Sequence, residues 1–155
     1  SVLYWLFGSF SSLNWQKTAI IILGVAILTS IMLLFAKELN VILLGDEQAQ
    51  QLGMNVKSFK TGMFVLVSAL AAVCVAFTGI IGFVGLIIPH MIRMLFGADH
   101  RLLFPASALF GGAYLMAADT VARILVSSTE LPVGVVTALC GAPYFIYLLR
   151  RKGGF

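Results

Sequence analysis

The chain has 155 residues, of which 61% are hydrophobic and only 10% are charged, and its mean hydropathy is +1.05. Soluble domains carry about 25% charged residues, so this composition excludes a soluble globular protein and predicts an integral membrane protein with several spans. The net charge of +4 does not indicate nucleic-acid binding, because the ten basic residues are scattered between apolar runs and form no basic face.

The chain begins with a predicted outer segment, residues 1–17, followed by a first membrane span. The start has neither Met nor a basic n-region, so we expect no signal peptide and a sequence that belongs to a longer protein. Residues 18–36 form an apolar run long enough to cross a hydrocarbon core of about 30 Å. Trp5 and Trp15 are expected at the outer interface, where tryptophan is enriched.

Residues 37–60 form a loop that combines polar and apolar stretches. Gly45 and Asp46 separate two short segments with helical character, and Asp46 is a favourable N-cap for the second segment. Residues 41–44 are all apolar. Two interpretations stay open: a hairpin lying on the membrane surface, or a docking surface for a cytoplasmic partner, since contiguous exposed apolar patches mark contacts.

The next apolar run covers residues 61–92. As one helix it would be about 48 Å long, which is too long for one crossing and too short for two. Glycines between residues 79 and 85 offer a break, so we predict a full span over residues 61–81 and a short return helix over residues 86–96. Broken helices at membrane depth need surrounding protein or a water-filled cavity, which indicates a pathway rather than an anchor.

Two further spans are predicted, over residues 105–126 and residues 133–149. Pro105 suits the first turn of the former, where a missing N–H costs no hydrogen bond. Gly141 and Pro143 lie inside the latter and are expected to kink it.

The basic residues support this arrangement of five membrane segments. Eight of them fall on one side, and two, Lys17 and Arg123, fall on or near the other, so the positive-inside rule makes the first side cytoplasmic. The eight are Lys37, Lys57, Lys60, Arg93, Arg101, Arg150, Arg151 and Lys152.

Several polar residues within the apolar segments are candidates for function. His90 and Arg93 share a helical face; His90 suits a structural hydrogen bond, and Arg93 suits snorkelling to the interface. Asp119 and Arg123 are four residues apart, which predicts an ion pair that is either structural or part of an outer gate or partner contact. Glu130 is either a solvated loop carboxylate or an outer contact for a basic residue of a binding protein.

The sequence offers no catalytic, cofactor or metal site. Cys74 and Cys140 each lie in an apolar run and are interpreted as small buried hydrophobes. We find no Cys/His cluster with metal-ligand spacing and no phosphate-binding loop, so we expect no nucleotide site, no cofactor and no enzymatic activity in this chain.

At this level of detail the sequence resembles the FecCD-type permeases, the membrane subunits of ABC importers for iron–siderophores, haem and vitamin B12. The resemblance rests first on residues 82–93, GFVGLIIPHMIR, which match the family signature, and it covers essentially the whole chain. Further matching blocks are residues 5–9 with Trp15, residues 44–53, residues 99–105, residues 118–123, residues 130–138 and residues 141–143.

The resemblance implies an all-α polytopic bundle forming the C-terminal half, spans six to ten, of a ten-span permease in the bacterial cytoplasmic membrane. It implies a homodimer, surrounded by lipid, that binds a cytoplasmic ATPase subunit and an extracytoplasmic substrate-binding protein. The ATPase-coupling loop then comprises Leu44, Gly45, Asp46, Glu47, Ala49, Leu52 and Gly53. The broken-helix motif comprises Gly82, Gly85, Pro89, His90 and Arg93.

The expected function is ATP-driven import of a ferric siderophore or related metal chelate, with haem and cobalamin as open alternatives. ATP and Mg²⁺ would bind the partner ATPase. A secondary transporter that uses Asp119, His90 or Arg93 for ion coupling is a second hypothesis, because broken helices suit it equally well. The apolar loop at residues 37–60 argues against it, since such a transporter docks no ATPase. An intramembrane enzyme lacks the necessary constellation of residues.

Overall fold

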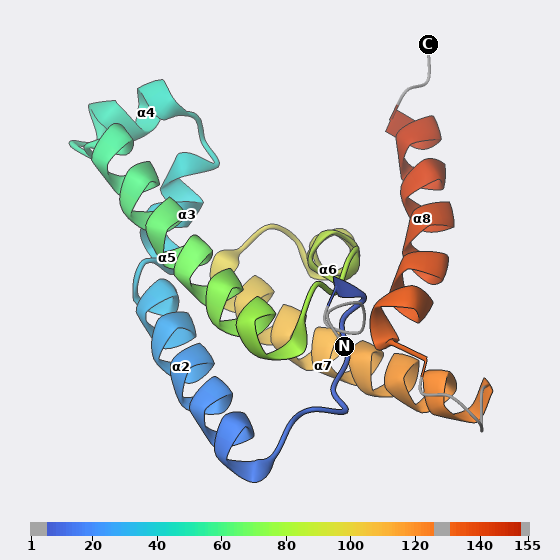
Figure 1. The fold of residues 1–155 in the computed structure, drawn as a ribbon. Coiled ribbons are helices and arrows are strands. Elements are labelled where there is room, and N and C mark those ends of the chain that lie inside the picture. The colour runs from blue at the N-terminus through green and yellow to red at the C-terminus, as the bar shows by residue number, and fades with distance from the viewer. Residues whose placement is uncertain (1–5, 126–130, 153–155) are drawn as a thin grey trace.

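The computed structural model describes residues 6–125 and 131–152, which fold into seven helices without any strand (Figure 1). Four of these helices are long and apolar enough to cross a membrane, and one shorter apolar helix lies between them. The predicted all-α membrane fold is therefore confirmed. The helices are α2 (Trp15–Leu34), α3 (Ala36–Ile42), α4 (Asp46–Gln51), α5 (Val56–Thr78), α6 (Val84–Phe96), α7 (His100–Leu125) and α8 (Val133–Lys152).

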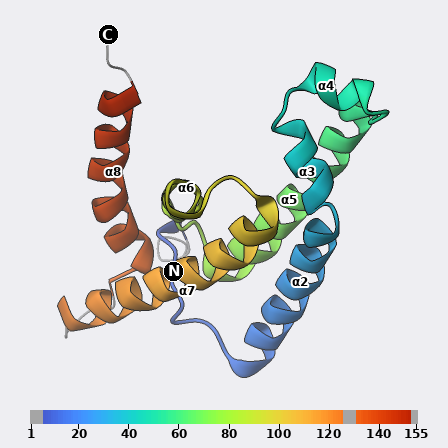
Figure 2. The ribbon, with the colours of Figure 1, turned by 180° about the vertical axis from the view of Figure 1, so that it is seen from behind.

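The four long helices pack as two pairs, α2 with α5 and α7 with α8. Helix α7 lies between the α2–α5 pair and α8, and α6 packs against both α7 and α8 (Figure 2). Gly24 lets α2 approach α5 closely, because a Cβ added there would lie 3.4 Å from Val73 Cγ1. One small core cluster, Ala118, Ala122, Val133 and Val136, joins α7 to α8, and another, Ile88, Ile92 and Leu103, joins α6 to α7.

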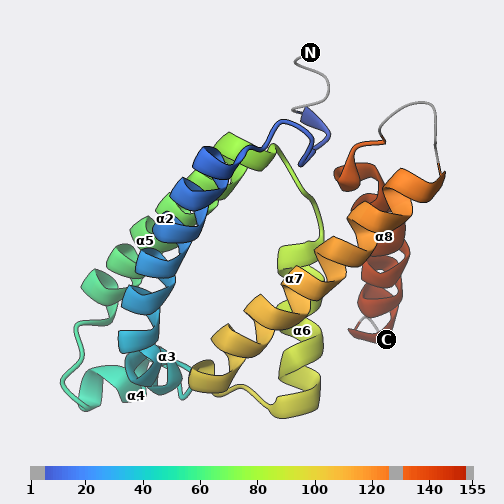
Figure 3. The ribbon, with the colours of Figure 1, turned by 90° about the horizontal axis from the view of Figure 1, so that it is seen from below.

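The connections separate into two ends of the molecule (Figure 3). Helices α3 and α4, the connection between α6 and α7, and the end of α8 gather at one end, which we call the basic end. Residues 6–13, the end of α5 and the start of α8 lie toward the opposite end. The start of α5, which includes Lys60, and the end of α6, which includes Arg93, thus lie toward the same end (Figure 3), as an even number of crossings between them requires.

The return from α5 to α6 is made by a short irregular stretch, residues 79–83. Gly79 has φ +73 and closes α5 by donating its N–H to the Val75 carbonyl at 2.9 Å. Helix α6 has 13 residues and is about 20 Å long, so it does not cross a hydrocarbon core alone. Protein covers part of the irregular stretch: Gly79 is buried and Ile81 packs on the α7–α8 core, while Ile80 is 51% exposed. Broken backbone at membrane depth must be buried in protein or line a water-filled cavity.

Two local predictions were wrong, and in both cases a distant residue is the cause. Pro105 does not open α7, because the helix begins at His100, where Asp99 and Asn40 cap its first turn. Asp46 is not an N-cap: it is the first residue of α4, after Gly45, and its carboxylate binds Lys60 instead, at 2.6 Å.

Candidate functional site

The residues of the predicted coupling loop form one compact feature at the basic end, which we call the α3–α4 lobe (residues 36–55). Ala49 is completely buried, and α4 packs on both α3 and α5. Glycines with positive φ flank α4, Gly45 at +116° and Gly53 at +84°. Other residues adopt such angles only with strain, so both glycines are needed for the tight turns that hold α4 against its neighbours.

The outer surface of the lobe is apolar and acidic. The side chains of Leu43, Leu44 and Leu52 are exposed, as are those of Asp46 and Glu47. An exposed group of leucines beside carboxylates is typical of a protein-contact surface.

Asn40 joins the lobe to the rest of the chain through three hydrogen bonds, a feature that we call the Asn40 bracket. Its Oδ1 accepts from the His100 backbone N–H at 2.9 Å and contacts His100 Nδ1 at 2.8 Å, and its Nδ2 donates to Asp99 Oδ1 at 2.7 Å. Because a backbone N–H only donates, the amide oxygen faces His100, and Nδ1 of that ring must carry the proton. Asn40 was not identified from the sequence. Its one signal in the sequence is its position as a polar residue next to the apolar run at residues 41–44.

The bracket completes the start of α7. The first N–H groups of a helix have no partner within it and need outside acceptors. Here His100 N–H donates to Asn40, and Arg101 N–H donates to Asp99 Oδ1 at 3.0 Å. Hydrogen bonds from the Arg101 N–H and the Asn40 amide hold the pKa of Asp99 below its ordinary value. We call residues 97–101 the α6–α7 corner; it is fixed to α3 by these contacts.

The broken-helix motif positions Phe83 rather than a titratable group. Phe83 has φ +68, the positive φ of a non-glycine residue, and it precedes α6 without offering a side-chain cap. Its ring lies against the Cα of Gly141 in α8 and near Phe145, with ring centroids 6.4 Å apart. Gly141 therefore forms a notch for the ring, a role that differs from the predicted kink.

The remaining motif residues shape α6 itself. Pro89 lies within α6 and has no N–H, so the carbonyl of Gly85, four residues earlier, receives no hydrogen bond from it. Gly85 has open space where a Cβ would stand. His90 is half-buried and Arg93 is exposed, and within residues 6–125 and 131–152 neither side chain makes a hydrogen bond or ion pair.

The predicted ion pair forms at the opposite end. Arg123 Nε donates to Asp119 Oδ2 at 2.8 Å, and the Arg123 side chain is 68% exposed in this chain. The pair borders a cavity of about 270 Å³ that also contacts Ser9 and Ser11. Glu130 lies outside the described residues.

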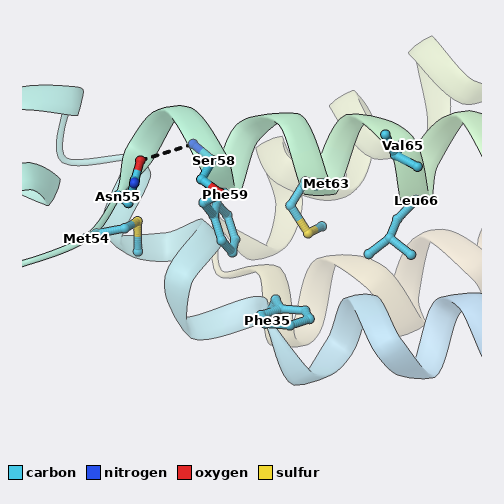
Figure 4. A pocket seen from close by; sticks show the side chains of 9 residues that line it. Phe35, Met54, Asn55, Ser58, Phe59, Met63, Val65 and Leu66 are labelled. Atoms are coloured by element: carbon cyan, nitrogen blue, oxygen red, sulfur yellow. Dashed lines mark hydrogen bonds between the residues drawn. The ribbon is translucent and has the colours of Figure 1, made fainter.

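An apolar groove of about 690 Å³ lies between α5 and the junction of α2 with α3 (Figure 4). Phe35 and Phe59 meet edge to face across it, with centroids 5.9 Å apart. At its polar end Asn55 caps α5 by accepting from the Ser58 N–H. The groove offers no charged or reactive lining, and among the described residues no three His, Cys, Asp or Glu side chains gather as metal ligands.

Comparisons with known proteins agree with this arrangement. Residues 1–151 match the FecCD transport family. The chain is 47% identical to the cobalamin import system permease protein BtuC of Halobacterium salinarum, over 97% of this chain and 40% of that protein. It is 45% identical to the hemin transport system permease protein HmuU of Yersinia pestis, over 96% and 44%. It is 40% identical to the molybdate import system permease protein MolB of Haemophilus influenzae, over 99% and 46%.

A solved structure has the same fold. It is a metal-chelate type ABC transporter in an inward-facing conformation, with a TM-score of 0.89 and 39% sequence identity over 97% of this chain and 48% of that one. The chain thus spans less than half the length of the curated relatives that it matches.

Proposed function

The chain belongs to the FecCD transport family, and from that premise we propose that it is the C-terminal half of the permease subunit of an ATP-driven importer. Its helical fold supplies four helices that are long and apolar enough to cross a membrane, together with the short apolar helix α6. In the proposed assembly two permease copies form the pathway in the bacterial cytoplasmic membrane, and the chain itself performs no covalent chemistry.

The observation that carries the proposal is the α3–α4 lobe at the basic end. It presents exposed leucines and carboxylates, and the positive-inside rule places that end in the cytoplasm. A cytoplasmic ATPase is the partner that such a surface suits. At the opposite end the exposed Arg123 and the polar cavity beside it suit an extracytoplasmic binding protein with acidic side chains.

We propose a ferric siderophore or a related metal chelate as the cargo, with haem or cobalamin as the alternative. The relatives named for cobalamin, hemin and molybdate support an importer of metal-containing compounds as a class. The described residues show no gathered metal ligands, which suits a cargo that crosses as a complete chelate rather than as a bare ion.

The test is uptake into proteoliposomes that contain the intact permease and its ATPase, with the binding protein added outside. We expect uptake of a ferric siderophore that requires ATP inside, and haem and cobalamin in parallel samples identify the cargo class. Uptake driven by a proton or sodium gradient without the ATPase would overturn the importer and favour a secondary transporter.

A further inference from the structure

We propose that Asn40 is a positioning residue that transmits movement of the α3–α4 lobe to the α6–α7 corner. This inference rests on the proposed function, because the lobe moves only if an ATPase acts on it. The bracket is the set of side-chain hydrogen bonds that joins the lobe to this corner within the described residues, and it links positions 59 and 60 residues apart in sequence.

The chemistry of the bracket requires an amide. Asn40 accepts through Oδ1 from two N–H groups of His100 and donates through Nδ2 to Asp99. Leucine has the same shape and supplies none of these bonds. Aspartate accepts from His100 but places a second carboxylate against Asp99, where it can donate nothing.

The connection is also short and stiff. Three bonds converge on one planar amide with few rotatable torsions, so a displacement of α3 is passed on with little slack. The pair Lys60–Asp46, in contrast, joins α4 to α5 through a long, half-exposed side chain, and such surface pairs contribute little. The lobe also packs on α5 through α4, and the bracket is its hydrogen-bonded connection to the α6–α7 corner.

The corner distributes the movement to two helices. Only residues 97–99 separate α6 from α7, and Gly97, with φ +89, closes α6 by donating to the Arg93 carbonyl. A shift of Asp99 and His100 therefore moves the end of α6 and the start of α7 together. At its other end α6 is preceded by Phe83, whose side chain is seated against Gly141. A packed path thus runs from the lobe through α6 to α8, and the experiment below tests whether movement is coupled along it.

The experiment uses the intact permease with its ATPase in proteoliposomes, and it compares Asn40→Ala with Asn14→Ala. Asn14 is a matched control outside the lobe, since it caps α2 and its side chain accepts only locally, from the Lys17 N–H. Spin labels at Gln51→Cys and Ala98→Cys, in a variant freed of its native cysteines, report the distance between α4 and the corner. Both positions are exposed.

In the permease with an intact bracket, we expect the distance between the two spin labels to be the same before and after ATP with vanadate traps the assembly, because the lobe and the corner move as one body. In Asn40→Ala the trapped state should show a changed or broadened distance. ATP hydrolysis should continue, while cargo uptake per ATP falls about tenfold, which corresponds to about 1.4 kcal/mol of lost coupling. Asn14→Ala should retain both the label distance and the uptake per ATP.

Equal uptake per ATP and equal label distances in Asn40→Ala and Asn14→Ala would overturn the inference. If Asn40→Ala does not fold, Asn40→Asp serves as the second variant, because it keeps both bonds to His100 while the donation to Asp99 is replaced by repulsion between two carboxylates. A reduced uptake per ATP is then expected, and full uptake contradicts the relay. Failure of the proposed function looks different, since the unaltered permease then shows no ATP-dependent uptake of ferric siderophore, haem or cobalamin.

Discussion

Replacing Gly141 by alanine should displace the ring of Phe83 and destabilise the contact between α6 and α8. The atom nearest to a Cβ at position 141 would be Phe83 Cβ, followed by Phe83 Cγ at 2.5 Å and Cδ2 at 3.1 Å, whereas carbon atoms pack at about 3.5–4.0 Å. The Phe83 side chain, its Cβ included, must therefore move by about 1 Å. Overpacking of this kind costs about 1–3 kcal/mol.

Phe83 has little freedom to yield. Its φ of +68° is already in the left-handed region, and its carbonyl accepts the N–H groups of Leu86 and Ile87 that open α6. Movement of the ring therefore disturbs the first turn of the helix. Gly112→Ala in α7 is the matched control, because nothing lies within 4 Å of the added Cβ and helix propensity favours alanine by up to about 1 kcal/mol.

The assay is thermal unfolding of the purified permease for Gly141→Ala, Phe83→Gly and the double variant. Glycine is used at position 83 because the atom nearest to the added methyl group is Phe83 Cβ, which alanine would keep. The clash needs both the added methyl group and the Phe83 side chain, so the double variant should be less destabilised than the sum of the single changes. We expect an interaction free energy of about 1–2 kcal/mol. Glycine also relieves the positive φ at position 83, and this gain is the same with glycine or alanine at position 141, so it cancels from the interaction free energy. Strictly additive losses would refute the notch.

Three further outcomes are expected. Ala49→Glu would bury a carboxylate in the fully buried centre of the lobe and should abolish ATPase binding in a pull-down while the permease still inserts. Asp119→Asn should lower the folded yield only slightly, because an exposed helical pair with Arg123 contributes about 0.3–0.5 kcal/mol; a large loss in yield would mean a buried pair. The folded pKa of Asp99 is depressed, so its contribution to stability is present above its unfolded pKa of about 3.9 and is lost as pH falls through the folded value. A spin label at position 98 should therefore gain mobility in acid, and the step should vanish in Asp99→Asn.

Features set by local length and charge were predictable from the sequence. The apolar run at residues 61–92 is too long for one span, and the charges on either side require a return, so the short helix α6 follows from simple arithmetic. The ion pair of Asp119 with Arg123 likewise follows from a spacing of four on one helix.

Features set by distant contacts were not predictable. The start of α7 depends on Asn40, and the role of Asp46 depends on Lys60, so capping rules applied to the local sequence gave the wrong residues. The notch at Gly141 depends on Phe83, which lies in another helix connection. A glycine within an apolar run has the same sequence appearance whether it kinks a helix or admits a ring.

The Asn40 bracket also sets an order of assembly during synthesis. Helix α7 belongs to the less apolar of the four candidate spans in the described chain, so it gains less from entering hydrocarbon than α2 or α5 does. The first turn of α7 is completed by the side chain of Asn40, which is synthesised about sixty residues earlier. The entropic cost of bringing Asn40 and His100 together falls once the intervening helices are in place, because the flexible length between them is then shorter. Correct insertion of α5 and α6 thus prepares the site that receives α7. A nascent chain whose α5–α6 hairpin fails leaves the first turn of α7 without its Asn40 acceptor.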